Sequence, residues 1–303
     1  MEGAAGGAAD ERSASVGDIE LCYEELGDPD GEPLLLVMGL GAQMILWDRA
    51  FCDLLGERGY RVIRFDNRDV GRSTHLRAPV PSRTAMLFGG GRPAYGLGDM
   101  AADAVGLLDA LDIESAHVVG ASMGGMITQV VGYEHPERAR SLGLIMTHSG
   151  HRVRATPTWR AFGALLARPA SDREGMIESM QRVFKIIGSP DYPMDPAQFR
   201  ALAEVTWERG YDAAGTARQL HAITASGNRT RRLATISAPT VVVHGTRDPL
   251  VRPSNGKLIA RTIPGAELLL LDGMGHDLPE PLWPRIIDAV DRNAKRAPAP
   301  VAA

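Results

Sequence analysis

The stretch Val118-Val119-Gly120-Ala121-Ser122-Met123-Gly124-Gly125-Met126 decides the fold of this 303-residue chain. Residues 115–119 form a short strand-like run, and residues 126–131 continue at helical spacing until Pro136. A strand that turns directly into a helix strains the residue at the turn, and nearby glycines let the two backbones pass closely. Gly-x-Ser-x-Gly in this context predicts a nucleophile elbow, with the Ser122 hydroxyl exposed beside a helix N-terminus. The alternative is a glycine-rich turn with a capping serine, so the motif needs partner residues elsewhere.

Composition narrows the class of protein. The chain is 44% hydrophobic and 23% charged, which is ordinary for a soluble globular protein. A formal net charge of −4 argues neither for nucleic acid nor for an anionic membrane surface as a partner, and we expect neither. No apolar run reaches the ~18 residues of a membrane span, and residues 1–10 lack the features of a signal peptide. Cys22 and Cys52 have no metal or redox spacing. We therefore expect a cytoplasmic protein. Its oligomeric state, monomer or homodimer, is left open by the sequence.

Strand and helix patterns alternate through the first half of the chain. The continuous apolar run at 33–38 is typical of a strand buried on both faces. Further strands are expected at 19–26, 60–66, 115–119 and 141–147, and helices at 45–58, 97–111 and directly after the elbow. Strands that alternate with helices predict an α/β protein with a mostly parallel, doubly wound sheet.

The alternation stops after His151 and resumes at Thr240. Strands are then expected at 240–245 and 267–271, and helices at 254–262 and 281–294. The stretch between is helical or loop-like and predicts a helical insertion, of the kind that forms a lid, rather than a second fold. The expected organisation has four parts. A disordered tail spans 1–14, the core spans 15–150 and 239–295, the helical insertion spans 151–238, and a flexible tail spans 296–303.

A serine hydroxyl needs a base to act as a nucleophile, and the base must itself be oriented by a third group. Asp248 follows the expected strand at 240–245, and His276 follows the one at 267–271. Because functional sites in such sheets form at the carboxyl ends of parallel strands, we expect both residues to meet Ser122 at one edge. The sequence thus predicts a Ser122–His276–Asp248 triad.

Other readings of these residues stay open. Asp248 could be a turn residue, and His276 could belong to a surface loop. Asp272 and Asp277 are rival acids, although both adjoin the histidine loop itself. His244 ends a strand and is expected to have a structural role.

Stabilising the oxyanion of an acyl-transfer reaction requires two N–H donors. The first is expected from Met123, the residue after the nucleophile, and the second from Leu40 in the loop after the first buried strand. A plain glycine turn at Gly39–Gly41 is compatible with this role, because backbone donors need only the right geometry.

These segments together resemble the α/β-hydrolase superfamily over about residues 18–150 and 238–294. Met38-Gly39, where His-Gly is commoner, and Asp66-Asn67-Arg68-Asp69 are similar to actinobacterial carboxylesterases and to the aclacinomycin-type methylesterases of anthracyclines. The matching segments are residues 35–41, 65–73, 120–125, 244–248 and 275–276. The resemblance implies Ser122, Asp248 and His276 as the triad, and Leu40 and Met123 as oxyanion donors.

The expected function is a serine esterase without metal or cofactor. Perhydrolysis or halide-dependent oxidation on the same triad is an alternative, as is a small-molecule receptor with low turnover. Dehalogenation is disfavoured because it needs a carboxylate where Ser122 stands.

Methionines crowd the motif loops and suit an adaptable apolar wall. We expect Gly39, Met44, His148 and Met274 to line the pocket, and Met126 to pack in the core. Because no Arg or Lys lies in the elbow, in loop 39–45 or beside His276, neutral hydrophobic esters are expected as substrates. They would have short to medium acyl chains, or be methyl esters of bulky rings. Preference for a charged substrate would implicate four arginines: Arg68, Arg72, Arg152 and Arg247.

Overall fold

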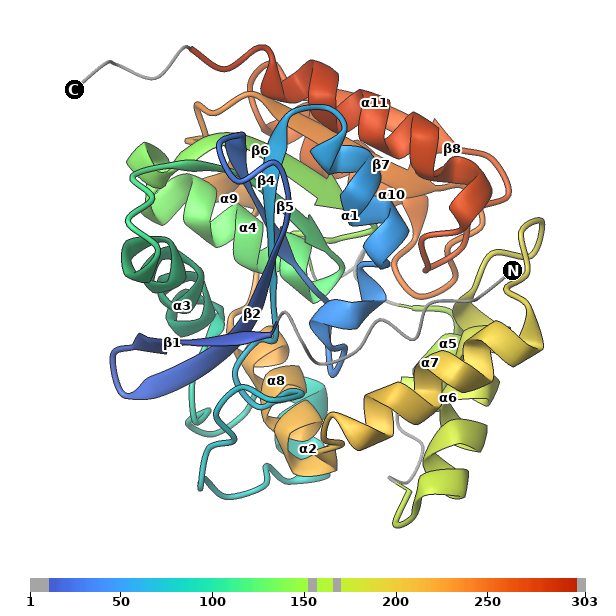
Figure 1. Cartoon of the computed structure of the whole chain (residues 1–303). Coiled ribbons are helices and arrows are strands. Elements are labelled where there is room, and N and C mark those ends of the chain that lie inside the picture. Colours follow the sequence, from blue (N-terminus) through green and yellow to red (C-terminus); the bar gives the residue numbers. More distant parts are fainter. Residues whose placement is uncertain (1–10, 152–156, 166–169, 299–303) are drawn as a thin grey trace.

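The computed structural model describes residues 11–151, 157–165 and 170–298. Within them, an eight-stranded sheet has the order β1-β2-β4-β3-β5-β6-β7-β8 (Figure 1). Strands β1 and β2 pair antiparallel at one edge, and β3 to β8 run parallel. The strands are β1 (Arg12–Val16), β2 (Ile19–Gly27), β3 (Glu32–Val37), β4 (Tyr60–Phe65), β5 (Ala116–Ala121), β6 (Ala139–Ile145), β7 (Thr240–Gly245) and β8 (Glu267–Leu271). The predicted doubly wound, mostly parallel sheet is confirmed.

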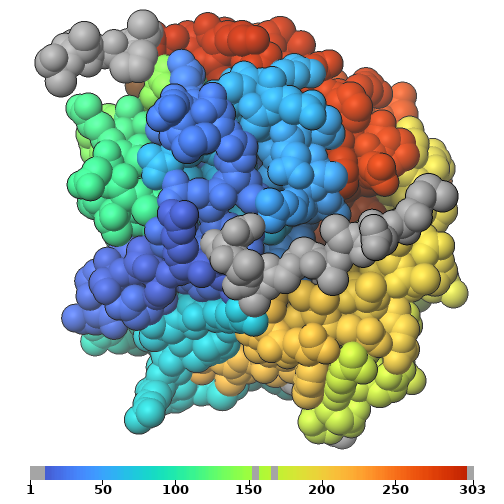
Figure 2. Space-filling view, viewed as in Figure 1, coloured from blue at the N-terminus to red at the C-terminus, as the bar shows by residue number. Residues whose placement is uncertain are grey.

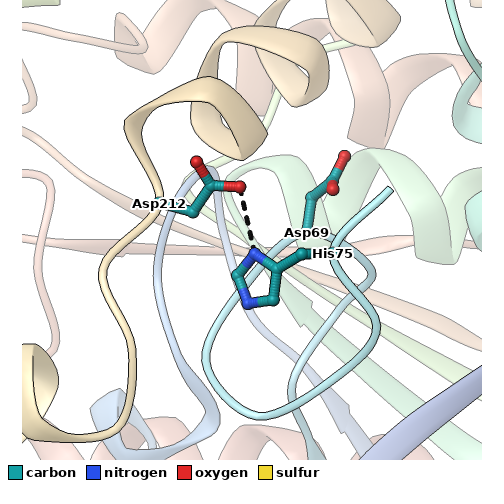
Figure 3. Close-up of side chains that lie close together, drawn as sticks. All are labelled: Asp69, His75 and Asp212. Atoms are coloured by element: carbon teal, nitrogen blue, oxygen red, sulfur yellow. Dashed lines mark hydrogen bonds and ion pairs between the residues drawn. The ribbon is translucent and has the colours of Figure 1, made fainter. Parts of the chain in front are cut away.

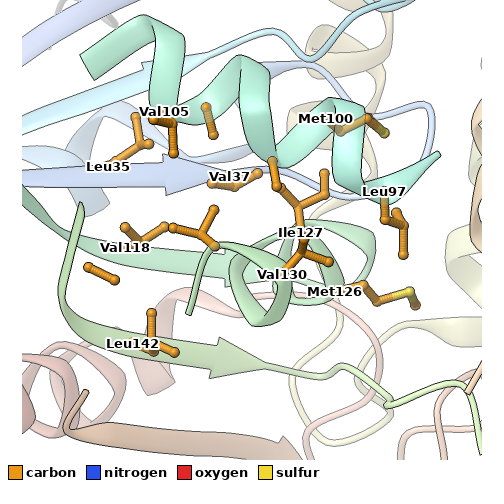
Figure 4. Close-up of a cluster of buried hydrophobic side chains, with 14 of the residues drawn as sticks. Leu35, Val37, Leu97, Met100, Val105, Val118, Met126, Ile127, Val130 and Leu142 are labelled. Carbon is orange, nitrogen blue, oxygen red and sulfur yellow. The ribbon is translucent and has the colours of Figure 1, made fainter. Parts of the chain in front are cut away.

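Helices cover both faces of the sheet, and β3 shows why its sequence is apolar throughout. Leu35 and Val37 belong to the hydrophobic cluster on one face, whereas Leu34 and Leu36 belong to the cluster on the other. The first face is covered by α3 (Leu97–Ala110), α4 (Met123–Glu134) and α10 (Pro253–Thr262). The second is covered by α1 (Arg49–Gly56) and α11 (Trp283–Ala294). Figure 4 shows the first cluster between the sheet and α3 and α4.

The described part of the insertion, residues 151–238, contains helices and no strand. They are α5 (Trp159–Leu165), α6 (Arg173–Ile187), α7 (Pro196–Glu208), α8 (Ala213–Ala225) and α9 (Thr230–Leu233). Helices α6 and α7 share a small apolar cluster in which the rings of Phe184 and Phe199 are 5.0 Å apart. On the face seen in Figure 2, the yellow and gold insertion adjoins the cyan segment that holds α2 (Arg83–Phe88).

Some boundaries differ from the expected ones. Strand β1 begins at Arg12, so part of the expected disordered tail pairs with β2 at the sheet edge. Helix α1 begins at Arg49 and not at residue 45, because Asp48 caps it by accepting from Ala50 N. A separate 3₁₀ turn, η1 (Met44–Leu46), precedes it. Residues 1–10 and 299–303 of the expected tails lie outside the described residues.

The shorter elements connect the main ones. Helix α2 lies in the segment between β4 and α3, where no helix was expected, and it packs beside α8 (Figure 1). Two further 3₁₀ turns are η2 (Pro136–Arg138) and η3 (Glu280–Leu282). No helix among the described residues has the length and hydropathy that crossing a membrane requires.

Candidate active site

The elbow has the close packing that its glycines predicted. Ser122 lies between β5 and α4 with φ +56° and ψ −116°, a region that side chains rarely adopt. A Cβ on Gly120 would overlap the Gly124 carbonyl, and one on Gly124 would overlap the end of β3 and lie 2.8 Å from Met38 O. The turn is also tied to β6, since Ser122 N donates to Ile145 O. These contacts therefore hold Ser122, which is half-buried, in a strained conformation at the helix N-terminus.

Three residues from distant parts of the chain form one hydrogen-bonded series. His276 Nε2 lies 2.9 Å from Ser122 Oγ, and His276 Nδ1 lies 2.8 Å from Asp248 Oδ2. Because an ionised carboxylate only accepts hydrogen bonds, Nδ1 carries the proton and Nε2 is free to accept from the serine hydroxyl. Asp248 and His276 are 3% and 8% exposed, so bulk water hardly competes for these bonds.

The Asp248 carboxylate is fixed and ionised. Its Oδ1 accepts from Leu250 N at 2.9 Å and Val251 N at 2.8 Å, which leaves Oδ2 for His276. Burial raises the pKa of Asp248, but the charge and hydrogen bond of His276, together with His244 Nε2 at 3.6 Å, outweigh it and bring the pKa to about 2. Asp248 is therefore charged at neutral pH.

The rival acids have other positions. Asp277 accepts from Ser189 N at 3.1 Å and also from Ser189 Oγ, so it binds the helical insertion. Asp272 is exposed. His244 is buried and donates from Nε2 to Val251 O at 2.6 Å, the structural contact expected of it.

The loop after β3 turns back against the elbow. Gly39 O accepts from Ala42 N at 3.3 Å, and Gly41 has φ +63°, as a tight turn requires. A Cβ on Gly39 would lie 3.2 Å from Ser122 Cβ. Among the described residues, the N–H groups of Leu40 and Met123 have no acceptor. Two free donors thus flank the serine from the two expected segments.

The other three predicted pocket residues, Met44, His148 and Met274, differ in how deeply they are buried. Met44 and Met274 are fully buried, and Met274 packs in the cluster under α11. His148 is half-buried, and its Nδ1 accepts from Gly150 N at 3.0 Å, so its proton lies on Nε2. Burial, followed by the charge of Arg229, lowers the pKa of His148 to about 3. A pocket role for all three stays a prediction.

The arginines near the motif loops are mostly paired. Arg68 binds Asp103, and Arg72 binds Glu11, while Arg247 is exposed. Arg152 lies outside the described residues. Arg229 was not predicted from the sequence; it is a buried cation that donates to His148 O at 2.9 Å and Gly227 O at 3.2 Å.

A group with the composition of a metal site, Asp69, His75 and Asp212, has its donor atoms within 4.8 Å of one another (Figure 3). However, Asp69 accepts two hydrogen bonds from Arg218, one from Tyr95 Oη and one from Leu76 N. Its four acceptor positions are therefore filled. The group is an ion-pair network that joins α8 to the loop after β4, not a cation site.

Two surface cavities lie elsewhere. One of about 430 Å³ lies between residues 76–94 and α8. The other, of about 630 Å³, lies between α5 and α6 and is lined in part by exposed Trp159. Neither is lined by Ser122, Asp248 or His276, so neither is where a substrate would meet the serine.

Known proteins support the same fold and family. The chain is 29% identical to the rhodomycin D methylesterase DauP of Streptomyces sp. strain C5 over 297 residues, which cover 88% of this chain and 92% of that protein. It is 28% identical to the rhodomycin D methylesterase DnrP of Streptomyces peucetius, covering 86% and 90%. The enol-lactonase of Burkholderia xenovorans LB400 superposes with a TM-score of 0.73 at 24% identity, over 94% of this chain and 100% of that one.

The resemblance expected from the motif segments is therefore confirmed. Residues 32–280 match the family of the alpha/beta hydrolase fold, and the chain belongs to that family.

Proposed function

We propose that this protein is a serine esterase that cleaves carboxylic esters through an acyl-enzyme intermediate. The observation that carries the proposal is the hydrogen-bonded series from Ser122 through His276 to Asp248. The similarity to methylesterases over most of the chain supports the same class, so the protein is a carboxylic ester hydrolase.

Acylation begins when Ser122 Oγ attacks the ester carbonyl carbon and its proton passes to His276 Nε2. Asp248, ionised and held by two backbone N–H groups, stabilises the imidazolium. The oxyanion accepts hydrogen bonds from Leu40 N and Met123 N, and Met123 also begins α4, whose dipole favours negative charge there. The tetrahedral intermediate then breaks the bond to the alcohol oxygen, which takes the proton from Nε2.

Deacylation repeats these steps with water. His276 Nε2 takes a proton from a water molecule, the resulting hydroxide attacks the acyl carbon, and the serine oxygen leaves with the returned proton. The products are the carboxylic acid and free enzyme. None of these steps needs a cofactor.

The substrate is proposed to be a neutral, hydrophobic ester. Arg68 and Arg72 are paired with acids, so neither is available to a carboxylate of the substrate. The two relatives are named as methylesterases of rhodomycin D, which favours a methyl ester on a bulky ring system. The helical insertion would act as the lid that excludes water.

The substrate proposal is tested by kcat/KM across p-nitrophenyl acetate, butyrate and octanoate, beside a half-ester that carries a free carboxylate. A higher kcat/KM for the charged half-ester than for the neutral esters would reject the proposed preference for neutral substrates. Arg229 and Arg247 would then be the cations to mutate.

The triad is tested with the Ser122→Ala variant and a fluorophosphonate probe. Ester hydrolysis should fall by about 10⁴- to 10⁶-fold, and intact-mass analysis of the wild type should show one adduct on Ser122. Adducts on another residue, or ester hydrolysis by Ser122→Ala at the wild-type rate, would reject Ser122 as the nucleophile. Peroxide-dependent oxidation in acetate faster than hydrolysis would favour a perhydrolase, and labelling without turnover of any ester would favour a receptor.

A further inference from the structure

A glutamine of the helical insertion is hydrogen-bonded directly to the loop that holds Leu40. Gln219 lies on α8 with no exposed surface. Its Oε1 accepts from Gly41 N at 2.8 Å, and its Nε2 donates to Arg68 O at 2.8 Å. Since one partner only donates and the other only accepts, the orientation of the amide is fixed. Gln219 therefore links the loop after β3 to the loop after β4.

The hydrogen bond from Gly41 N to Gln219 lies directly beside Leu40, the expected oxyanion donor. Gly39 is held against Ser122, and Gly41 is held by Gln219, so Leu40 is fixed from both sides. The other face of Gly41 is closed by Thr216 of the same helix, because a Cβ on Gly41 would lie 2.8 Å from Thr216 Oγ1. A shift of α8 would therefore move Gly41 and, through it, Leu40, whose N–H lies one peptide earlier in the turn.

The neighbouring residues brace the same loop less directly. Gln43 donates to Thr206 O at 2.8 Å and Gly210 O at 2.9 Å, and it accepts from Arg209 at 3.0 Å. Arg209 in turn binds the buried Asp66. These contacts fix the far end of the loop, whereas Gln219 reaches the turn itself.

We propose that Gln219 is a positioning residue that holds the Leu40 N–H in the oxyanion hole, so that the helical insertion takes part in completing the active site. This role rests on the proposed esterase mechanism. If Gln219 is lost, the ground-state ester should still bind, but the donor should be misplaced when the oxyanion forms.

The test compares Gln219→Met, which removes both hydrogen bonds at similar volume, with Gln219→Glu, which keeps an oxygen for Gly41 N. His75→Gln is the matched control, because it alters another contact between the insertion and the core, that of His75 with Asp212, without touching the 39–44 loop. For Gln219→Met we expect kcat for p-nitrophenyl butyrate to fall by about 10- to 100-fold with KM within about twofold, since removing an oxyanion donor outright costs more. Gln219→Glu should lose less, and the control should retain kcat.

A second readout does not depend on ester turnover. The phosphonyl oxygen of a fluorophosphonate occupies the oxyanion site, so the rate of Ser122 labelling should fall by a similar factor in Gln219→Met. An unchanged labelling rate, a loss confined to KM, or an equal loss in His75→Gln would overturn the positioning role. In those cases normal wild-type hydrolysis would leave the esterase proposal standing. If the wild-type protein is labelled at Ser122 but hydrolyses no ester, the esterase proposal is rejected. The labelling rates still report the effect of Gln219.

Discussion

Gly275, the residue before His276, packs directly on the backbone of Gly188 at the end of α6. A Cβ on Gly275 would overlap the Gly188 carbonyl and lie 2.6 Å from Ile187 O. The same junction is closed by two hydrogen bonds, from His276 N to Ile187 O at 2.7 Å and from Gly275 N to Ser189 Oγ at 2.8 Å. The helical insertion thus supports the histidine loop as well as the loop of Leu40.

Gly275→Ala should therefore impair catalysis more than binding. The added methyl group would overlap the backbone of Ile187 and Gly188, so the His276 loop must shift, and a misplacement of about 1 Å can cost about 10²-fold in rate. We expect a drop of about that size in kcat for p-nitrophenyl butyrate with little change in KM. Gly163→Ala on α5 is the control, because a Cβ there meets nothing within 4 Å. Equal kcat in the two variants would contradict the argument.

The assignment of the triad acid can be tested by amide substitutions. Asp248→Asn should keep the position of the side chain but favour the wrong tautomer of His276, and kcat should fall by about 10⁴-fold. Asp277→Asn keeps an oxygen for Ser189 and should lose much less activity. Steady-state kinetics of both variants decide the matter, and a larger loss in Asp277→Asn would mean that Asp248 is not the triad acid.

The sequence was most informative where backbone geometry dictates residue type. Gly120 and Gly124 are needed because two backbones touch at the elbow, and continuous apolar strands identified the centre of the sheet. Strand ends then indicated where Asp248 and His276 would meet Ser122, and the structure brings the three within hydrogen-bonding distance. Their catalytic roles stay a prediction.

Long-range polar contacts could not be read from the sequence. Gln219 and Gly41 are 178 residues apart, and a glutamine on a helix looks like any solvent-facing residue until the fold buries it. Strand β1 was missed for a related reason, because Arg12–Val16 is short, partly polar and stabilised by pairing at an edge. Such features depend on tertiary neighbours rather than on local pattern.

The strain at Ser122 predicts an unusual order of stability. At φ +56° and ψ −116° a residue with a Cβ pays a conformational penalty of about 1–3 kcal/mol that glycine avoids. Ser122→Gly and Ser122→Ala should both lack esterase activity, yet the glycine variant should be the more stable of the two by about 1 kcal/mol. Urea unfolding of the two variants measures this difference. If alanine were equally stable, the elbow would not be strained.

His75 should make stability depend on pH near neutrality. Burial lowers the pKa of His75, but its hydrogen bonds to Gly71 O and to Asp212 outweigh burial, and the pKa lies above its ordinary value. Both partners only accept, so the ring binds them best as the imidazolium, beside the Asp69–Arg218 pair. A raised pKa in the folded state means that the stabilisation is complete below the unfolded-state pKa of about 6.5 and is lost as the pH rises through the folded-state value. Urea unfolding of the wild type and His75→Gln should therefore differ most near pH 6 and converge near pH 9, since other groups titrate equally in both proteins. A difference that stayed constant between these pH values would show that the His75 contact is not ionic.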